Sequence, residues 1–312
     1  MFEHLFSKGG LSLDRLRGFM QMAEAGSIAR AAPGDTNRQS QISRQIRELE
    51  QFFGAELTRR KGKTLSLSAA GERLALLIRE QLQDLEDFRK EQAGLPKSFV
   101  IGAGASVLEW LLVPALPAIS RHLGGATLLT EAHRSRSLGD AVQDGRVDLA
   151  IIRQNAVPAG TNTALVMKMR FHLCIPRTLL KRDTTERDAA SPALWQMLPF
   201  AAGRDGGQTD TAIREAMRSA GVDFHPRFEC GSMLQVRQLV GLGACAGILP
   251  TLGIRGLDER RVLITPFAPL RDFGRALVLY WNPRQMRRRG VETADLKRLA
   301  SLIAAQTGPT AA

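Results

Sequence analysis

Cysteine is scarce in this sequence of 312 residues, which holds three, at Cys174, Cys230 and Cys245. Their odd number, wide spacing and lack of any Cys-x-x-Cys pair exclude a recognisable disulfide framework and a cysteine-based zinc site. The sequence also lacks an apolar run of the roughly 18 residues that span a bilayer, and its start lacks the pattern of a secretory signal. We therefore expect a cytoplasmic protein that does not bind membranes.

Patterns of common catalytic chemistry are missing as well. The sequence holds no metal-spaced cluster, no Gly-Lys-Ser/Thr phosphate loop and no Ser/His/Asp set with a supporting context. Gly102-x-Gly104 follows an apolar segment, but the third glycine of a dinucleotide fingerprint is absent. We expect no catalytic residues, no metal ion and no cofactor.

Positive charge is abundant, and the formal net charge of +12 is compatible with a nucleic-acid partner. Residues 1–97 hold 16 basic and 13 acidic residues, so most of the excess lies downstream. An argument for DNA binding must therefore rest on where the charges lie. With 44% hydrophobic and 24% charged residues the chain should be globular, and its length predicts two or three domains.

The first part of the chain predicts a pair of short helices. Apolar residues at helical spacing predict a helix over 13–25, with Ser12 as its N-cap and Gly26 at its end. A second, shorter helix over 27–32 should end at Pro33-Gly34.

A third helix and a hairpin follow. The helix should begin near Thr36, where Thr36-x-x-Gln39 matches a capping box, and should end at Gly54. Two short apolar pieces, 56–58 and 64–67, then flank the basic turn Arg-Arg-Lys-Gly-Lys.

The third helix has two unlike faces. Its apolar stripe is Ile42, Ile46, Leu49 and Phe53, and its other side carries Gln39, Ser40, Ser43, Arg44 and Arg47. A major groove admits one α-helix, in which Gln can bond adenine and Arg can bond guanine or phosphate. The basic turn suits a wing against the flanking backbone. Taken alone, the same pattern also fits an amphipathic surface helix beside a charged turn.

A long helix is expected from Ser68 or Ala69 to about Gln92. Its narrow apolar stripe comprises Leu74, Leu77, Ile78, Leu82, Leu85 and Phe88. Such a stripe with charged flanks packs either on its own chain or against a partner helix. The composition of Gly94–Lys97 then indicates a linker.

The remaining residues alternate between strand-like and helical patterns. This alternation predicts α/β layers with mostly parallel sheets, in which ligands bind at the carboxyl ends of strands. Pro114 and Pro117 should kink or break the helix over 108–122. Expected strands lie near 99–102, 126–130, 149–152, 166–175, 198–202, 227–230, 246–249 and 276–281, and further helices near 138–144, 209–220, 233–242 and 294–305.

Polar and basic residues follow several of these strands. They give the expected effector-binding residues: Ser106, Arg134, Ser135, Arg153, Gly203, Arg204 and Ser232. Purely structural alternatives stay open: Ser106 and Ser135 could be plain helix caps, and Arg204 could be an exposed loop residue. Several arginines near the cleft favour a small anion, such as an aromatic or dicarboxylic acid.

The N-terminal segments resemble the signature of LysR-type transcriptional regulators. The matching segments, in order and at the family's spacing, are Leu16–Ser27, Ala31-Ala32, Gln39–Ile46, Leu49-Glu50 and Leu67–Gly71. The resemblance implies that Arg38–Glu50 is the recognition helix and that Arg60–Lys63 tips the wing. The expected DNA-binding residues are Arg38, Gln39, Ser40, Gln41, Ser43, Arg44, Arg47, Arg60, Lys61 and Lys63.

Three N-terminal positions depart from the family pattern. Pro33-Gly34-Asp35 stands where members usually continue a longer second helix, which bears on the tilt of the recognition helix. Arg38 replaces a usual Ser, and Thr58-Arg59 replaces an aromatic–acidic pair. Both replacements add positive charge and suggest a shifted operator preference.

The C-terminal part is similar to the LysR-type effector domain, which itself resembles periplasmic binding proteins. Asp144–Ile151 and Val240–Pro250 carry this resemblance, and Ser106 and Ser135 match the family's effector-contacting positions. Cys245 and Gly104-Ala105 are departures beside the expected cleft.

We thus predict an α/β protein with a winged helix-turn-helix at 11–68, a linker and dimerisation helix at 69–94, and an effector-binding domain at 97–312. That domain should have two Rossmann-like lobes resembling a type 2 periplasmic binding protein. Lobe I is expected at about 97–165 and 271–312, and lobe II at about 166–270.

The resemblance implies a homodimer through antiparallel linker helices, commonly assembled into a homotetramer, on double-stranded operator DNA with two-fold-related half-sites. A second hypothesis is a cytoplasmic solute-binding protein whose N-terminal domain serves only dimerisation or non-specific DNA binding. Sequence-blind DNA binding would favour the latter.

Overall fold

The computed structural model describes residues 2–7, 9–61, 64–158, 160–204, 206–273 and 275–306. The chain forms two compact units, Met1–Leu95 and Pro96–Ala312, each of which is described by itself. Among the described residues, no helix has the length and apolar character needed to cross a membrane.

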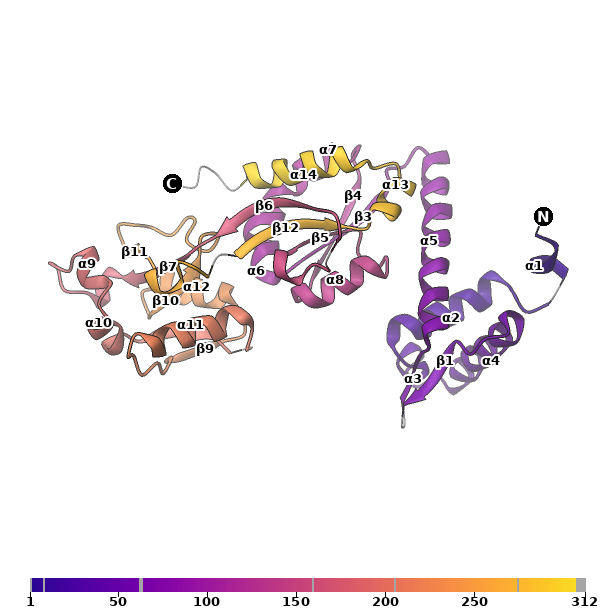
Figure 1. Ribbon diagram of the computed structural model, residues 1–312, viewed down its shortest axis with the longest axis horizontal. Helices are drawn as coiled ribbons and strands as arrows, with labels where there is room; N and C mark the ends of the chain where they lie inside the picture. The colour runs from indigo at the N-terminus through magenta and orange to yellow at the C-terminus, as the bar shows by residue number, and fades with distance from the viewer. Residues whose placement is uncertain are drawn as a thin grey trace. The chain divides into compact units, whose positions relative to one another are not determined.

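The first unit is mainly helical (Figure 1). Its elements are α1 (Glu3–Ser7), α2 (Leu13–Ala25), α3 (Ile28–Ala31), α4 (Thr36–Phe53), β1 (Thr58–Lys61), β2 (Thr64–Leu67) and α5 (Ala69–Gln92). The Ser12 hydroxyl accepts from Arg15 N at the start of α2, and Gly26, with φ 71°, ends it. Gly54, with φ 64°, ends α4 in the same left-handed conformation. Glycine adopts this conformation without a Cβ clash, so these predicted ends are confirmed.

Two local predictions in this unit were wrong. Asp35, not Thr36, caps α4, because the Asp35 carboxylate accepts from Arg38 N at 2.9 Å. The hairpin begins later than expected, so Arg59 and Lys61 belong to β1 rather than to a turn. The physical reason is Glu50, whose Oε1 accepts from Leu57 N at 2.9 Å and from Thr58 N at 3.1 Å. The Leu57 N–H is therefore engaged with α4, and the strand begins at the next residue, Thr58.

A single apolar core holds the first unit together. Its fully buried members include Phe19, Met22, Ile42, Ile46, Leu49 and Leu57. The start of α5 packs closely on this core at Gly71, where an added Cβ would lie 2.0 Å from Leu57 O. A side chain at this position would therefore push α5 away from the hairpin.

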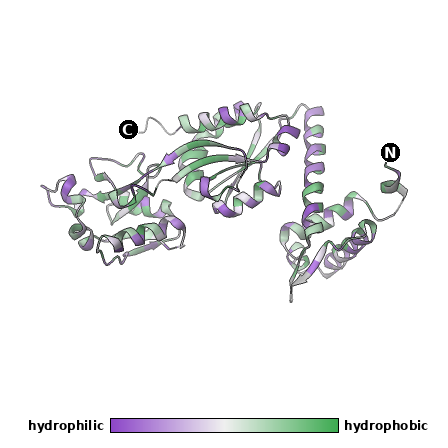
Figure 2. Cartoon of the chain, in the orientation of Figure 1, coloured by the Kyte–Doolittle hydropathy of each residue, from purple (hydrophilic) through white to green (hydrophobic). Residues whose placement is uncertain are grey.

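The second unit contains two five-stranded sheets, which define lobe I and lobe II. The lobe I sheet has the order β4 (Thr127–Ala132), β3 (Ser98–Ala103), β5 (Leu149–Arg153), β12 (Arg275–Trp281), β6 (Thr163–Met169). The lobe II sheet has the order β11 (Val262–Pro266), β7 (Phe171–Pro176), β10 (Ala246–Pro250), β8 (Phe200–Gly203), β9 (Phe228–Cys230). In Figure 2 the strands of the lobe I sheet are predominantly hydrophobic, as expected for a sheet with buried faces.

Both sheets are mixed: the predicted parallel direction holds for four strands of each sheet, and one strand runs against them. In lobe I, β3 is parallel to β4 and β5, whereas β12 is antiparallel to β5 and β6. In lobe II, β8 is parallel to β9 and β10, whereas β7 is antiparallel to β10 and β11. The opposed strands, β7 and β12, are those by which the chain enters lobe II and then re-enters lobe I. The first crossing lies at Arg170, between β6 and β7, later than the expected boundary at about 165.

Helices cover the sheets of both lobes. Lobe I carries α6 (Ala105–Val107), α7 (Val113–His122), α8 (Ser135–Gln143), α13 (Pro283–Arg288) and α14 (Thr293–Ala305). Lobe II carries α9 (Glu186–Ala189), α10 (Pro192–Met197), α11 (Gln208–Ser219) and α12 (Met233–Gly241). A π-helical turn over Leu108–Leu112 joins α6 to α7. Pro114 lies in the first turn of α7 and Pro117 inside it, so the predicted irregularity is confirmed.

A buried ion pair ties together three parts of lobe I. Asp148 and Arg289 are 5% and 3% exposed, and their Oδ1 and Nη1 atoms are 2.8 Å apart. The other carboxylate oxygen of Asp148 accepts from Val100 N at 2.7 Å, and Gln285 Nε2 donates to Oδ1 at 2.8 Å. Asp148, part of the segment that resembles the family, therefore joins β3 to α13.

We expect Asp148→Ala to lower the free energy of unfolding of this unit by about 3–5 kcal/mol, because it leaves the Arg289 charge buried without its acid. Urea denaturation followed by circular dichroism measures the loss. The matched control is Asp144→Ala, whose carboxylate pairs with Arg146 at 3.0 Å and is 55% exposed. An exposed pair contributes about 0–1 kcal/mol, so equal losses in both variants would contradict the assignment.

Candidate nucleic-acid interface and ligand cleft

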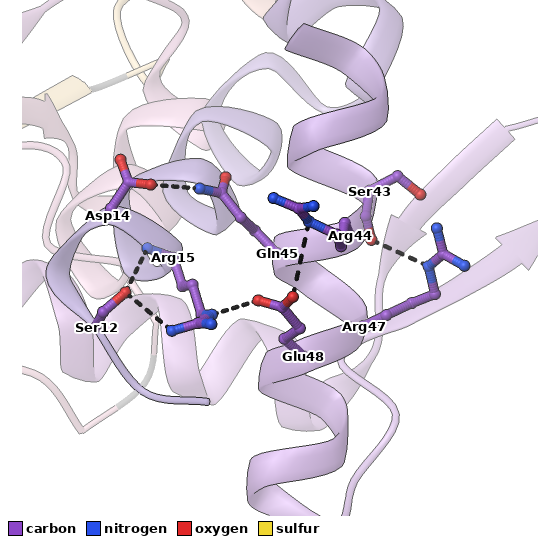
Figure 3. Close-up of polar contacts among 8 residues, drawn as sticks. All are labelled: Ser12, Asp14, Arg15, Ser43, Arg44, Gln45, Arg47 and Glu48. Atoms are coloured by element: carbon purple, nitrogen blue, oxygen red, sulfur yellow. Dashed lines mark hydrogen bonds and ion pairs between the residues drawn. The ribbon is translucent and has the colours of Figure 1, made fainter. Parts of the chain in front are cut away.

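Polar contacts hold α4 in a defined orientation on α2 (Figure 3). Gln45 is 4% exposed, and its Nε2 donates to Asp14 Oδ2 at 2.7 Å. Gly18 makes room for this amide, since an added Cβ would lie 2.0 Å from Gln45 Oε1. Arg15 pairs with Glu48, and its hydrogen bond lowers the pKa of that carboxyl. These contacts lie on the α2-facing side of α4 and leave its other side available.

The outward side of α4 presents three of its seven predicted contact residues as exposed side chains. Ser40, Arg44 and Arg47 are exposed, and the Arg44 side chain retains 71% of its accessible surface. Arg44 Nε lies 3.7 Å from Glu48, and Arg47 Nε donates to Ser43 O at 3.4 Å. Two guanidinium groups therefore project from one exposed helical face, as phosphate or guanine recognition requires.

Three predicted contact residues at the start of α4 make bonds within their own domain. Arg38 donates to Gln21 at 2.7 Å and to Gln41 at 2.8 Å. Gln39 Nε2 donates to Ala32 O at 2.7 Å. Together with the Asp35 cap, these bonds fix the entry of the chain into α4 after the short α3. The departure from the family pattern at Pro33-Gly34-Asp35 is thus accommodated by local hydrogen bonds.

The wing is only partly described. Arg60 and Lys61 pair by their backbones with Leu65 and Thr64 in an antiparallel hairpin. The side chains of Arg60 and Lys61, and all of Lys63, lie outside the described residues. The hairpin itself agrees with the wing that the resemblance implied.

A cavity of about 420 Å³ lies between the two lobes of the second unit. Six of the seven predicted effector residues line it: Ser106, Arg134, Ser135, Arg153, Gly203 and Ser232. Arg204 is exposed and is not among the lining residues, which fits the loop-surface alternative. Sequence reasoning missed the apolar floor of Trp110, Met169, Phe171, Leu252 and Met233, and the polar group Gln208, Thr209 and Asp210.

The two serines of lobe I are not helix caps. Gly104 precedes α6 as its N-cap residue and Arg134 precedes α8, so Ser106 and Ser135 lie inside the first turns. Ser135 Oγ accepts from Arg153 Nε at 3.4 Å. Gly102 serves packing, because an added Cβ would lie 2.2 Å from Leu138 Cδ2 of α8. Gly102 therefore permits close helix–sheet packing, and Gly104 forms part of the cavity wall.

Arg153 is the residue that reaches across the cavity. It stands at the end of β5 in lobe I, and its Nη1 donates to Gln208 Oε1 at the start of α11 in lobe II. Burial, and then the nearby Arg136, lower the pKa of its guanidinium. Among the described residues its hydrogen-bond partners are neutral oxygens. The site therefore holds a partly desolvated positive charge that an anion would stabilise.

The three cysteines are buried thiols. Burial raises the pKa of Cys174 to about 12 and that of Cys245 to about 11, so both are protonated near neutral pH. Cys230 lines the cavity, and burial raises its pKa as well. No group of His, Cys, Asp and Glu among the described residues is arranged to hold a metal ion.

Family models match both parts of the chain. Residues 13–72 match the bacterial regulatory helix-turn-helix protein model of the LysR family. Residues 92–294 match the LysR substrate binding domain. The second match alone covers more than half of the sequence.

Two curated relatives align over most of their length. A probable nitrogen assimilation transcriptional activator of Synechococcus elongatus is 28% identical over 273 residues, covering 83% of this chain and 85% of that protein. A RuBisCO operon transcriptional regulator of Acidithiobacillus ferrooxidans is 29% identical over 248 residues, covering 78% and 79%.

Solved structures share the fold. A full-length OxyR variant from Pseudomonas aeruginosa has a TM-score of 0.60 at 19% identity and covers 96% of each chain. Full-length CbnR, solved in complex with its target DNA, has a TM-score of 0.55 at 18% identity, covering 93% of this chain and all of that chain. Together with the two family models, these matches confirm the predicted resemblance: the chain belongs to the LysR family of helix-turn-helix transcriptional regulators.

Proposed function

We propose that this chain is a sequence-specific regulator that reads an operator through α4 and responds to a small anionic effector bound between its two lobes. It acts by binding rather than by catalysis, in the cytoplasm, as a homodimer through α5 that assembles further into a homotetramer. The observation that carries the effector part is the partly desolvated Arg153 in the cavity wall.

The exposed face of α4 supports the assignment of DNA contacts. Ser40, Arg44 and Arg47 extend from the domain, whereas Arg38, Gln39 and Gln41 must exchange internal hydrogen bonds for DNA contacts. Ser43, Arg60, Lys61 and Lys63 complete the proposed contact set, with the wing cations on flanking phosphates. We assign base reading mainly to Arg44, because its side chain is 71% exposed, whereas that of Glu48, with which it pairs, is 31% exposed.

The exposed apolar residues of α5 support a dimer. Ala75 and Ile78 are buried in the core of the first unit, but Leu77, Leu85 and Phe88 are 48%, 58% and 60% exposed. Large apolar side chains on one side of a helix whose other sides are charged are stabilised by a partner helix. A second copy of α5 supplies such a surface by two-fold symmetry.

The lobe I wall supports the anion. Arg134, Ser135 and Arg153 meet at the N-terminal end of α8, whose first turn holds no acidic residue. Helix N-termini and guanidinium groups both favour negative charge. Ser106, Gly203 and Ser232 complete the proposed effector contacts, and Arg204 is left out because it does not line the cavity.

For DNA binding, an operator is first selected by the full-length protein from random duplexes. We expect Arg44→Ala to weaken binding to it by about 10- to 100-fold and to relax the preference at one base pair. Arg218→Ala removes an equal charge from an exposed site on α11 and should change affinity less than about twofold. Fluorescence anisotropy measures both. Equal affinity of the parent for selected and random duplexes would instead favour the solute-binding hypothesis.

For dimerisation, we expect the double variant Leu85→Glu and Phe88→Glu to shift the protein to monomers, because four buried charges would face one another at a two-fold interface. Sedimentation velocity measures the mass. Met197→Glu is the control, since Met197 is 76% exposed on α10 in lobe II. A variant that keeps the parent's mass would show that α5 does not hold the subunits together.

For the effector, we expect Arg153→Gln to reduce the affinity for a small carboxylate such as benzoate by about 10- to 100-fold, the loss typical of a charged hydrogen bond. Isothermal titration calorimetry on the full-length protein measures it. Arg182→Gln, at an exposed position in lobe II, is the charge-matched control. Unchanged carboxylate binding in Arg153→Gln would reject the anion site.

A further inference from the structure

The two walls of the cavity carry opposite charges. Among the described lining residues, the arginines, Arg134 and Arg153, both belong to lobe I. The one acidic lining residue in that set, Asp210, belongs to lobe II. A ligand that spans the cavity therefore meets cations at one end and a carboxylate at the other.

The helix ends strengthen this difference. The first turn of α8 in lobe I contains no acid, so its N-terminal partial charge adds to that of the arginines. The first turn of α11 contains Asp210, which opposes the partial charge there. The start of α12 holds neither an acid nor a cation, and its Gly231 N already donates to Gln235 Oε1 at 2.8 Å. The N-terminus of α12 can therefore offer a ligand at most about half of a positive elementary charge.

Asp210 is an incompletely compensated carboxylate. It is 8% exposed, and its Oδ2 accepts from Arg214 Nε at 3.3 Å. Arg214 is shared, because its Nη2 also donates to Glu229 Oε1 and to Gly203 O, each at 3.2 Å. The other oxygen of Asp210, Oδ1, is buried and has no hydrogen-bond partner among the described residues. The local sum of Asp210, Glu229 and Arg214 is one negative charge.

Apolar side chains also line the cavity. Trp110, Met169 and Phe171 line the cavity together with Met233 and Leu252. Aromatic and thioether groups favour a flat hydrophobic body. Such walls have a lower polarizability than water, so charge–charge interactions beside them are stronger than in bulk solvent.

We propose that the effector is a monoanion with an apolar, flat body, whose acidic group binds at Arg153 and whose far end is uncharged, and that Asp210 excludes ligands with a second carboxylate. This inference rests on the proposed anion site. It selects between the two acid classes that the arginines alone allow: an aromatic monoacid fits, and a dicarboxylic acid does not. A hydroxyl at the far end is tolerated, because it can donate to acceptors of lobe II.

Two aromatic acids that differ only at the far end test this. Isothermal titration calorimetry on the full-length protein compares 4-hydroxybenzoate with terephthalate. We expect the parent to bind 4-hydroxybenzoate roughly tenfold or more tightly, since a second carboxylate would be repelled by Asp210. Asp210→Asn keeps the side-chain shape and should reduce the ratio to roughly threefold or less, mainly by improving terephthalate binding. Arg214 retains Glu229 as a partner in this variant.

Asp223→Asn is the control, because Asp223 pairs with His225 at an exposed site of lobe II and is 79% exposed. Its selectivity ratio should match that of the parent. Thermal unfolding checks that both variants fold.

Three outcomes overturn the inference in distinguishable ways. If terephthalate binds as well as 4-hydroxybenzoate and both need Arg153, the monoanion inference fails while the proposed anion site stands. If the parent is selective but Asp210→Asn remains equally selective, Asp210 is not the excluding residue. If neither acid binds, and a simpler monocarboxylate such as benzoate does not bind either, the proposed anion site itself fails.

Discussion

The hydrogen bonds of Arg153 connect the two lobes through partners that carry no charge. Its guanidinium reaches Ser135 on its own lobe and Gln208 on the other, while burial and Arg136 destabilise its charged form. Such a group gains free energy when an anion replaces neutral oxygens. An acid that takes the place of Gln208 also removes a contact between lobes. Binding at this residue is therefore coupled to the geometry of the cleft, which is the property a regulatory domain requires.

The DNA-binding unit has a different requirement. One face of α4 must pack firmly on its own domain, and the opposite face must stay exposed. The apolar stripe alone would permit small rotations, but Gln45 and Glu48 add directional bonds to Asp14 and Arg15 of α2. The Asp35 cap and the bond from Gln39 to Ala32 fix the N-terminal end. Arg44 and Arg47 therefore extend from a helix held by several directional bonds, and such preorganisation reduces the entropy lost on binding a partner.

Local chemistry was predictable from the sequence, and long-range pairing was not. Ser12, Gly26, Gly54 and Ser68 sit at helix ends as predicted, because capping depends on residues within one turn. Asp35 displaced Thr36 as a cap because the choice between adjacent side chains depends on how Pro33-Gly34 directs the chain. The opposed direction of β7 and β12 was missed for a similar reason: it depends on where the chain re-enters each lobe, which periodicity does not encode.

The residues of the candidate cleft also divide into those that the local sequence predicts and those that depend on long-range contacts. Ser106, Ser135 and Arg153 were identifiable because each follows a recognisable strand and the family resemblance marks two of them. Gln208 and Asp210 lie at the start of a correctly expected helix, but their importance arises from what faces them across the cavity. Arg204 follows a strand as well, yet it is exposed. A position at a strand end thus indicates a candidate, and only the fold shows which side chains enter the cavity.

We propose that effector and operator binding are coupled through Arg153. Thermodynamic linkage requires that an acid change operator affinity by the same factor by which the operator changes acid affinity. Both affinities can be measured on one full-length preparation, by anisotropy on the selected operator and by calorimetry on the acid. We expect the acid to change operator affinity, and the operator to change acid affinity, by the same factor, on the order of 5- to 150-fold in either direction. In Arg153→Gln we expect neither affinity to change. A factor of one in the parent protein, with the acid demonstrably bound, would contradict the proposed coupling.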